Sequence, residues 1–150
     1  MSPETIKIII TAVLLLHGVA HGRAFFCLAA TAGGGGSQVW IPVQSWLFPK
    51  AAKKTAAGIA AIFWLLATLG FIAAALGFWG LILPGEYWRQ LALVSAVIST
   101  LGTVIFSGIW PGAPDRRLST LDTAISLVIN VVVVVALAIL QWPPVSMFGK

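Results

Sequence analysis

The chain has 150 residues, of which 59% are hydrophobic and only 9% are charged, and its formal net charge is +5. A soluble domain carries roughly 25% charged residues, so this composition excludes an ordinary soluble enzyme, a disordered chain and a polar nucleic-acid-binding domain. The composition instead predicts an integral membrane protein, in which lipid replaces water over most of the surface. Its excess of basic residues then indicates membrane topology and contact with anionic headgroups, and no nucleic-acid partner is expected.

Four apolar segments are long enough to cross the ~30 Å hydrocarbon core as helices, which requires ~20 residues. They lie at residues 6–32, 56–83, 91–110 and 121–142. Lipid offers the backbone no hydrogen-bond partner, and the runs are too long and uniformly apolar for barrel strands, so helices are expected. The sequence therefore predicts an all-α integral membrane protein, with a single transmembrane domain over residues 1–150 folded as an antiparallel four-helix bundle.

Glycine, proline and small polar residues mark the expected ends of these spans. The four-glycine run at 33–36 is expected to end the first helix, and Pro84 with Gly85 the second. The candidate N-caps of the fourth helix are Ser119, Thr120 and Asp122.

The longest connection, residues 33–55, is rich in aromatic residues and ends in a basic stretch. It contains Trp40, Trp46, Phe48, Lys50, Lys53 and Lys54. Because aromatic side chains favour the membrane interface over water, this loop is expected to lie on the interface or to fold back over the bundle.

Basic residues are unevenly divided between the two ends of the predicted bundle. The end with the termini holds Lys7, Arg89 and Lys150, whereas the other end holds Arg23, Lys50, Lys53, Lys54, Arg116 and Arg117. By the positive-inside rule, loops 33–55 and 111–120 face the cytoplasm of a cell membrane, and both termini face outward.

The first span carries the polar residues that fit a membrane helix least well. His17 lies about 16 Å along the helix from residue 6, near the middle of the bilayer, and His21 follows one turn later on the same face. Ionisable groups at this depth indicate a functional site. Gly18 and Gly22 have GxxxG spacing beside the histidines, which allows another helix to approach closely.

Several roles for the histidine pair stay open. A closed metal site needs three or four ligands, and two histidines on one helix face cannot both ligate one haem, so neither arrangement is predicted. The open interpretations are hydrogen bonds to Ser or Thr of a neighbouring helix, single-histidine ligation of a haem or chlorin, and a proton-relay, quinone or small-ligand role. His17 and His21 are thus the candidate cofactor-binding residues, without an identified cofactor, and no catalytic residue is predicted.

Arg23 follows His21 by two residues and therefore points to nearly the opposite face of the helix. It is expected to snorkel to the cytoplasmic headgroups, or to form an anion or headgroup site within the bundle.

Small and hydroxyl residues recur at helical spacing on the other spans. The third carries Ser95, Ser99, Thr103 and Ser107, and the second carries Ala67, Gly70, Ala74 and Gly77. Both stripes predict packing seams between helices, and the hydroxyl stripe offers the best partners for the histidines. Asn130, half-way along the fourth span, is expected to fix the register through a hydrogen bond to another helix.

Short motifs spread over the chain support a family resemblance. They are His17-Gly-Val-Ala-His21, Gly58 followed by Trp64-Leu-Leu-Ala67, and Trp110, Asp115 and Ser119-Thr-Leu121 before the fourth span. In these motifs the chain resembles small four-span bacterial membrane proteins of uncharacterised function and is loosely similar to DoxX-type four-helix membrane proteins. Some DoxX-type proteins are linked to quinone or thiol redox systems, so the resemblance implies a redox association. Arg23 and the glycine-rich first loop depart from the pattern.

The sequence contains no phosphate loop, nucleophile elbow, CxxC or HExxH motif, which favours a non-enzymatic protein. The first hypothesis is an accessory or partner-binding subunit of a membrane complex, because the small-residue seams exceed what four helices need. Its partners would be other membrane chains, or further copies in a homo-oligomer, besides the bilayer itself. The alternatives are a redox- or cofactor-associated protein that uses His17 and His21, and an oligomeric small-solute transporter or channel.

Overall fold

The structure is a computed structural model, and it describes residues 1–34, 45–82, 84, 86–106 and 110–144. Its helices are α1 (Pro3–Ala32), α2 (Lys53–Phe78), α3 (Trp88–Ile105) and α4 (Arg116–Val134), and α4 continues into a π-helical turn, η1 (Val135–Ile139). The described residues contain no strand, and four helices are long and apolar enough to cross a membrane. The all-helical fold with four candidate spans is thereby confirmed.

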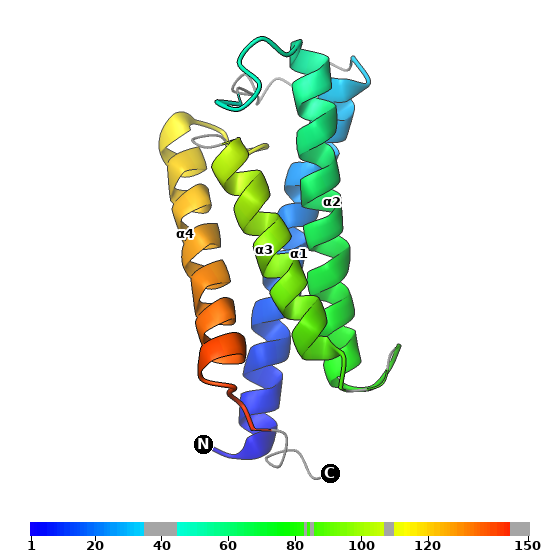
Figure 1. Cartoon of the computed structure of the whole chain (residues 1–150), viewed down its shortest axis with the longest axis vertical. Coiled ribbons are helices and arrows are strands. Elements are labelled where there is room, and N and C mark those ends of the chain that lie inside the picture. The colour runs from blue at the N-terminus through cyan, green and yellow to red at the C-terminus, as the bar shows by residue number, and fades with distance from the viewer. Residues whose placement is uncertain (35–44, 83, 85, 107–109, 145–150) are drawn as a thin grey trace.

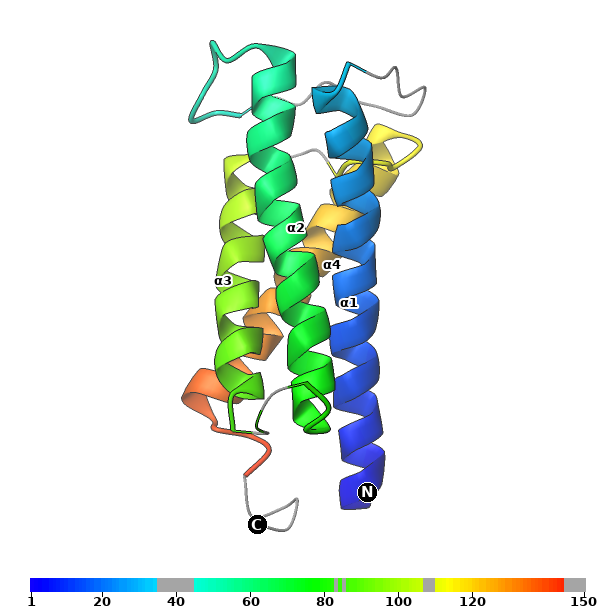
Figure 2. The same cartoon turned by 90° about the vertical axis from the view of Figure 1, so that its right-hand side faces the viewer.

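The helices pack mainly in chain order, α1 on α2, α2 on α3 and α3 on α4. The end of α1 and the start of α2 lie at the upper end of the molecule, whereas the end of α2 and the start of α3 lie at the lower end (Figure 1). α4 slants across the side of the bundle, as the turned view also shows (Figure 2). Its contact with α1 is sparse, so one side of the bundle is less tightly closed than the others.

Glycines allow α1 and α2 to approach closely. A Cβ atom on Gly18 would lie 3.1 Å from Ile72 and 3.3 Å from Phe71, and one on Gly22 would lie 3.3 Å from the Thr68 methyl group. These distances are at or below ordinary van der Waals contact, so larger side chains would push the helices apart. The predicted GxxxG spacing of α1 is therefore used inside this chain.

A second close approach joins α2 to α3. A Cβ atom on Gly70 would overlap Oγ of Ser95, and one on Gly102 would lie 2.8 Å from Cβ of Phe63. Gly77, the fourth member of the predicted α2 stripe, is also buried. Gly18, Gly22 and Gly70 therefore pack against neighbouring helices of the same chain.

Two apolar clusters fill the core and leave a polar layer between them. One contains Leu14, Phe71, Trp88 and Val133 among others, and the second contains Leu28, Trp64, Phe106 and Trp110 among others. Along α1, His17 and His21 fall between the residues of the two clusters.

Two helix ends differ from the sequence predictions. α2 ends at Phe78 instead of residue 83, because Gly80 adopts a left-handed conformation (φ 67°). The Leu81 N–H then donates to the Leu76 carbonyl and the Gly80 N–H to the Gly77 carbonyl, which is a Schellman ending. The break therefore precedes Pro84.

The predicted N-caps of the fourth helix, Ser119, Thr120 and Asp122, are wrong. α4 starts at Arg116, and Asp115 is its N-cap, because the Asp115 carboxylate accepts a hydrogen bond of 2.8 Å from the Leu118 N–H. Asp115 precedes the three predicted residues and caps the N–H of Leu118, so the helix begins before Ser119.

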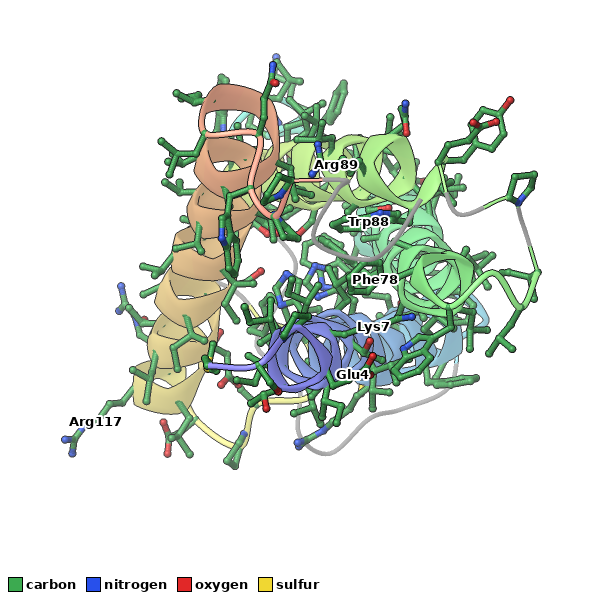
Figure 3. All side chains as sticks on the ribbon, turned by 90° about the horizontal axis from the view of Figure 1, so that it is seen from below. Glu4, Lys7, Phe78, Trp88, Arg89 and Arg117 are labelled. Atoms are coloured by element: carbon green, nitrogen blue, oxygen red, sulfur yellow. The ribbon has the colours of Figure 1, made fainter. Side chains whose placement is uncertain are left out.

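The lower end of the bundle carries an aromatic and basic cluster. The Lys7 ammonium lies 4.2 Å from the Trp79 ring centroid, and the rings of Phe78 and Trp88 are 4.4 Å apart. Arg89 donates to the main-chain carbonyls of Gln141 and Pro143 and ties the end of α4 to α3. Seen from below, Lys7, Phe78 and Trp88 lie together between the helices, whereas Arg117 points outward at the far end (Figure 3). Such a belt is typical of a membrane interface.

Of the predicted interfacial loop 33–55, Trp40 lies outside the described residues. Trp46 is exposed, and its indole N–H donates to the Val104 carbonyl at 2.7 Å, near the end of α3. The described part of the loop thus lies across the upper end of α3.

The α2–α3 seam predicts that Gly70→Ala destabilises the protein and that adding Ser95→Ala restores most of its stability. Gly70→Ala should lower the free energy of unfolding by about 1–2 kcal/mol, because the new methyl overlaps Ser95. Ser95→Ala should recover most of this loss in the double variant, since the Ser95 hydroxyl bonds only to the Leu91 carbonyl of its own helix.

Gly58→Ala is the matched control, because its Cβ would meet only Ala32 at 3.9 Å. The unfolding midpoints of the native chain, Gly70→Ala, the double variant and Gly58→Ala are compared by thermal unfolding in mild detergent. Equal midpoints for Gly70→Ala and Gly58→Ala would contradict the seam.

Candidate functional site

The candidate site is a layer of polar side chains in the middle of the bundle. His17 and His21 are 4% and 1% exposed, and their ring centroids are 4.5 Å apart. Ser99 of α3 and Asn130 of α4 are buried beside them. Three helices therefore contribute to one polar layer enclosed by apolar clusters.

Hydrogen bonds connect these four side chains in series, in what is called below the hydrogen-bonded chain. His17 Nε2 lies 2.9 Å from Asn130 Oδ1, and Asn130 Nδ2 donates to Ser99 Oγ at 2.7 Å. Because an amide oxygen only accepts, His17 carries its proton on Nε2 and donates it to Asn130. His21 Nε2 lies 2.5 Å from the same Ser99 Oγ. Asn130 thus links α4 to both α1 and α3.

Aromatic rings enclose the inner end of this chain. His21 contacts Trp110 and Phe71 at centroid distances of 5.1 and 5.9 Å, and His17 meets the edge of Phe71 at 4.7 Å. Nδ1 of His21 is buried and has no hydrogen-bond partner among the described residues. The apolar cage keeps competing polar groups away from the histidines and so favours the interhelical bonds.

Arg23 lies on α1 near the upper end of the site and does not join the histidine chain. Its guanidinium donates to the Gly112 carbonyl at 2.8 Å, in the turn between α3 and α4. Gly112 has a φ of 84°, and a Cβ atom there would lie 2.9 Å from Cys27 Sγ, so the turn requires glycine at this position. Arg23 therefore ties α1 to the α3–α4 turn.

A cleft of about 330 Å³ lies between α1 and α4 beside the polar layer. Its lining includes His17, Arg23, Trp110, Asp122 and Ser126. The Ser126 hydroxyl is in a residue only 2% exposed and has no hydrogen-bond partner among the described residues. Buried hydroxyls normally find a partner, so this group marks a place where a ligand would gain a hydrogen bond. His17 is the member of the hydrogen-bonded chain that reaches the cleft.

The predicted hydroxyl stripe of α3 is only partly used between helices. Ser99 bonds to His21 and Asn130, whereas the hydroxyls of Thr103 and Ser95 donate to the Ser99 and Leu91 carbonyls of their own helix. Ser107 lies outside the described residues.

Sequence reasoning did not assign Asp122, Ser126 and Trp110 to the site. A signal was present, because Asp122, Ser126 and Asn130 follow one another at four-residue steps and so share one face of α4. Asp122 and Ser126 of this face line the cleft, and Asn130 lies one turn further along it.

The Nε2 atoms of the histidines are engaged in hydrogen bonds with Asn130 and Ser99, whereas Nδ1 of His21 is without a partner among the described residues. Within the described parts of the chain, no group of three or more His, Cys, Asp or Glu side chains is placed to hold a metal ion. The site is arranged for hydrogen bonding.

Comparison with protein-family models, curated proteins and solved structures found no match for this chain. The class therefore follows from the structure itself. Four helices of sufficient length and apolar character are compatible with a small multi-pass membrane protein.

Two neighbouring hydroxyl residues on α3 test the polar layer. Ser99→Ala should lower the free energy of unfolding by about 1–2 kcal/mol, because it leaves the Asn130 amide and a His21 nitrogen without their partner. Thr100→Ala should change it by only about 0.5 kcal/mol, because the Thr100 hydroxyl donates to Ala96 of its own helix.

Denaturant titration in mild detergent compares the two variants. If Thr100→Ala were as destabilising as Ser99→Ala, the loss would reflect hydroxyl removal from α3 in general, and the interhelical role of Ser99 would be refuted.

Proposed function

We propose that this chain is a non-enzymatic multi-pass protein of the cell membrane that binds a lipid-soluble molecule in the cleft between α1 and α4. The observation that carries the proposal is the cleft beside His17, with the buried and unpartnered Ser126 hydroxyl on its wall. Small-molecule sites are typically apolar clefts with a few fixed polar groups, and the α1–α4 cleft has this composition.

The hydrogen-bonded chain supports the proposal by holding His17 in place. Asn130 accepts from His17 Nε2 and is itself held by Ser99, so the imidazole that reaches the cleft has a fixed orientation. A pre-positioned polar group costs a ligand less ordering on binding. This supports the redox- or cofactor-associated alternative in its quinone-like form.

A helix of a partner chain is the second candidate occupant. The observation in its favour is the sparse contact between α1 and α4, which leaves one side of the bundle open. The packing glycines give it less support than the sequence suggested, because Gly18, Gly22 and Gly70 are occupied by contacts inside the chain.

The proposal includes an antiparallel topology, with both termini outside and loops 33–55 and 111–120 in the cytoplasm. In support, the ends of α1 and α4 that lie nearest the termini share one end of the molecule (Figure 1), and the opposite end carries most of the basic residues.

Cysteine labelling tests this topology. In a Cys27→Ala background, Glu4→Cys should react with a membrane-impermeant maleimide in intact cells, whereas Arg117→Cys should react only after permeabilisation. Both residues are exposed and near opposite ends of the bundle. The reverse pattern would overturn the orientation, and identical patterns would overturn the odd number of spans, α1 to α3, between the two residues.

Filling the cleft tests the binding function. Ala20 lines the cleft, so Ala20→Trp should occupy it, whereas Ala12→Trp places the same side chain on an exposed position of α1 outside the cleft. Each protein is purified in mild detergent, and its bound small molecules are extracted and identified by mass spectrometry. The native chain and Ala12→Trp should retain a defined lipid-soluble molecule that Ala20→Trp loses.

Equal contents in all three proteins would refute the binding function. Loss of a co-purifying membrane chain from Ala20→Trp, with no loss of a small molecule, would favour the partner helix instead.

A further inference from the structure

Two pockets lie between α1 and α4 on the open side of the bundle, and together they are called the groove. The upper one is the cleft described above, and the lower one, of about 210 Å³, lies between α1 and the end of α4. Val13 lines both of them. The lower pocket is lined by aliphatic and aromatic side chains and proline, among them Ile9, Leu14, Val132 and Leu137. The groove is therefore polar at its upper end and apolar at its lower end.

The polar end carries two opposite charges that are not paired with each other. The Arg23 guanidinium donates one hydrogen bond, to Gly112, and the Asp122 carboxylate makes no hydrogen bond or ion pair within the described residues. Ser126 lies one turn below Asp122 on the same face, and its buried hydroxyl is also without a partner there. A carboxylate and a hydroxyl beside lipid are costly unless something binds them.

The distance from Asp122 to the upper edge of the lower pocket matches the depth of one leaflet. Asp122 is about 10 Å along α4 from its N-cap, Asp115, because a helix rises about 1.5 Å per residue. We assign this depth to the headgroup region. Ten residues further, about 15 Å deeper, lies Val132 in the apolar pocket, and about 15 Å is half of the ~30 Å hydrocarbon core. A lipid chain that starts beside Asp122 therefore reaches Val132, at the upper edge of the lower pocket, within one leaflet. The rest of this pocket, which includes Trp88 and Trp142, extends toward the lower end of the bundle.

From this pattern we infer that the groove is a site for a zwitterionic phospholipid with a primary ammonium, of the phosphatidylethanolamine type. The phosphodiester pairs with the Arg23 guanidinium, and the ammonium donates to the Asp122 carboxylate and the Ser126 hydroxyl. One acyl chain follows the groove past His17 to Val132, at the upper edge of the apolar pocket. The inference rests on the binding function proposed above and names its ligand class. An anionic lipid satisfies Arg23 but is repelled by Asp122, so the charge pair selects against it.

Lipid competition tests the inference. The purified chain is equilibrated with equal amounts of phosphatidylethanolamine and phosphatidylglycerol that have identical acyl chains, and the bound lipids are counted by native mass spectrometry. The native chain should favour phosphatidylethanolamine by about tenfold, which corresponds to about 1.4 kcal/mol. Equal binding of the two lipids, or a preference for phosphatidylglycerol, would overturn the inference.

Two variants connect the preference to the charge pair. Asp122→Asn should remove the preference for phosphatidylethanolamine and favour phosphatidylglycerol, because Arg23 is then the only charge at the head site. Arg23→Gln should weaken binding of both lipids. Glu4→Gln and Arg117→Gln make the same chemical changes on residues away from the groove, and they should leave the preference unchanged. The site would be refuted if Asp122→Asn kept the preference for phosphatidylethanolamine and had the same unfolding temperature as the native chain.

Failure of this inference is distinguishable from failure of the binding function. If Ala20→Trp loses its bound molecule while the native chain shows no preference between the two lipids, the cleft binds a different ligand. If Ala20→Trp and the native chain hold the same lipids, both the binding function and the lipid site are wrong.

Discussion

The structure depends on how the buried Asn130 side chain is satisfied in the middle of the bundle. Its oxygen accepts from His17 of α1, and its nitrogen donates to Ser99 of α3. Neither water nor lipid supplies alternative partners at that depth, so each group is satisfied only when three helices stand in one register. A single amide therefore sets the height of α4 relative to α1 and α3, although α4 touches α1 only sparsely.

Close packing and the polar layer have different effects on the bundle. Glycines at the α1–α2 and α2–α3 seams bring the backbones together, and no side chain fills the space between them. The α1–α4 side has no such seam, so the helices are linked there by the His17–Asn130 bond and enclose a cleft. The cleft is thus a consequence of where the small residues are placed along the chain.

Much of the fold was predictable because a long apolar segment in lipid must satisfy its backbone hydrogen bonds within a helix. Length and apolarity defined the four spans, and α1 ends at Ala32, where the glycine run begins, as expected. Helix ends were less predictable where competing signals lie close together. Gly80 ends α2 before Pro84 is reached, and Asp115 caps α4 ahead of the three predicted residues. The position of each helix end thus depends on which of the neighbouring residues forms the capping hydrogen bonds.

The residues of the site were more predictable than the hydrogen bonds between them. Helical spacing pointed to His17, His21, Ser99 and Asn130, but spacing on one helix cannot tell which face of another helix it meets. For that reason Thr103 was grouped with Ser99, although its hydroxyl bonds within its own helix. Asp122 and Ser126 were missed because each has an ordinary explanation alone, as a cap or a small packing residue. Only the slant of α4 places them opposite Arg23.

The order of the polar partners along the chain has a consequence for membrane insertion. The histidines of α1 enter the bilayer first, and the helix that follows, α2, supplies glycine-mediated contact but no hydrogen bond to either imidazole. Their partners are on α3 and α4, which are synthesised last. A nascent chain that has inserted only its first hairpin therefore carries two unsatisfied imidazoles in lipid. Insertion of α3 and α4 supplies these partners, so the two imidazoles are stabilised only when the last two helices have joined the first pair.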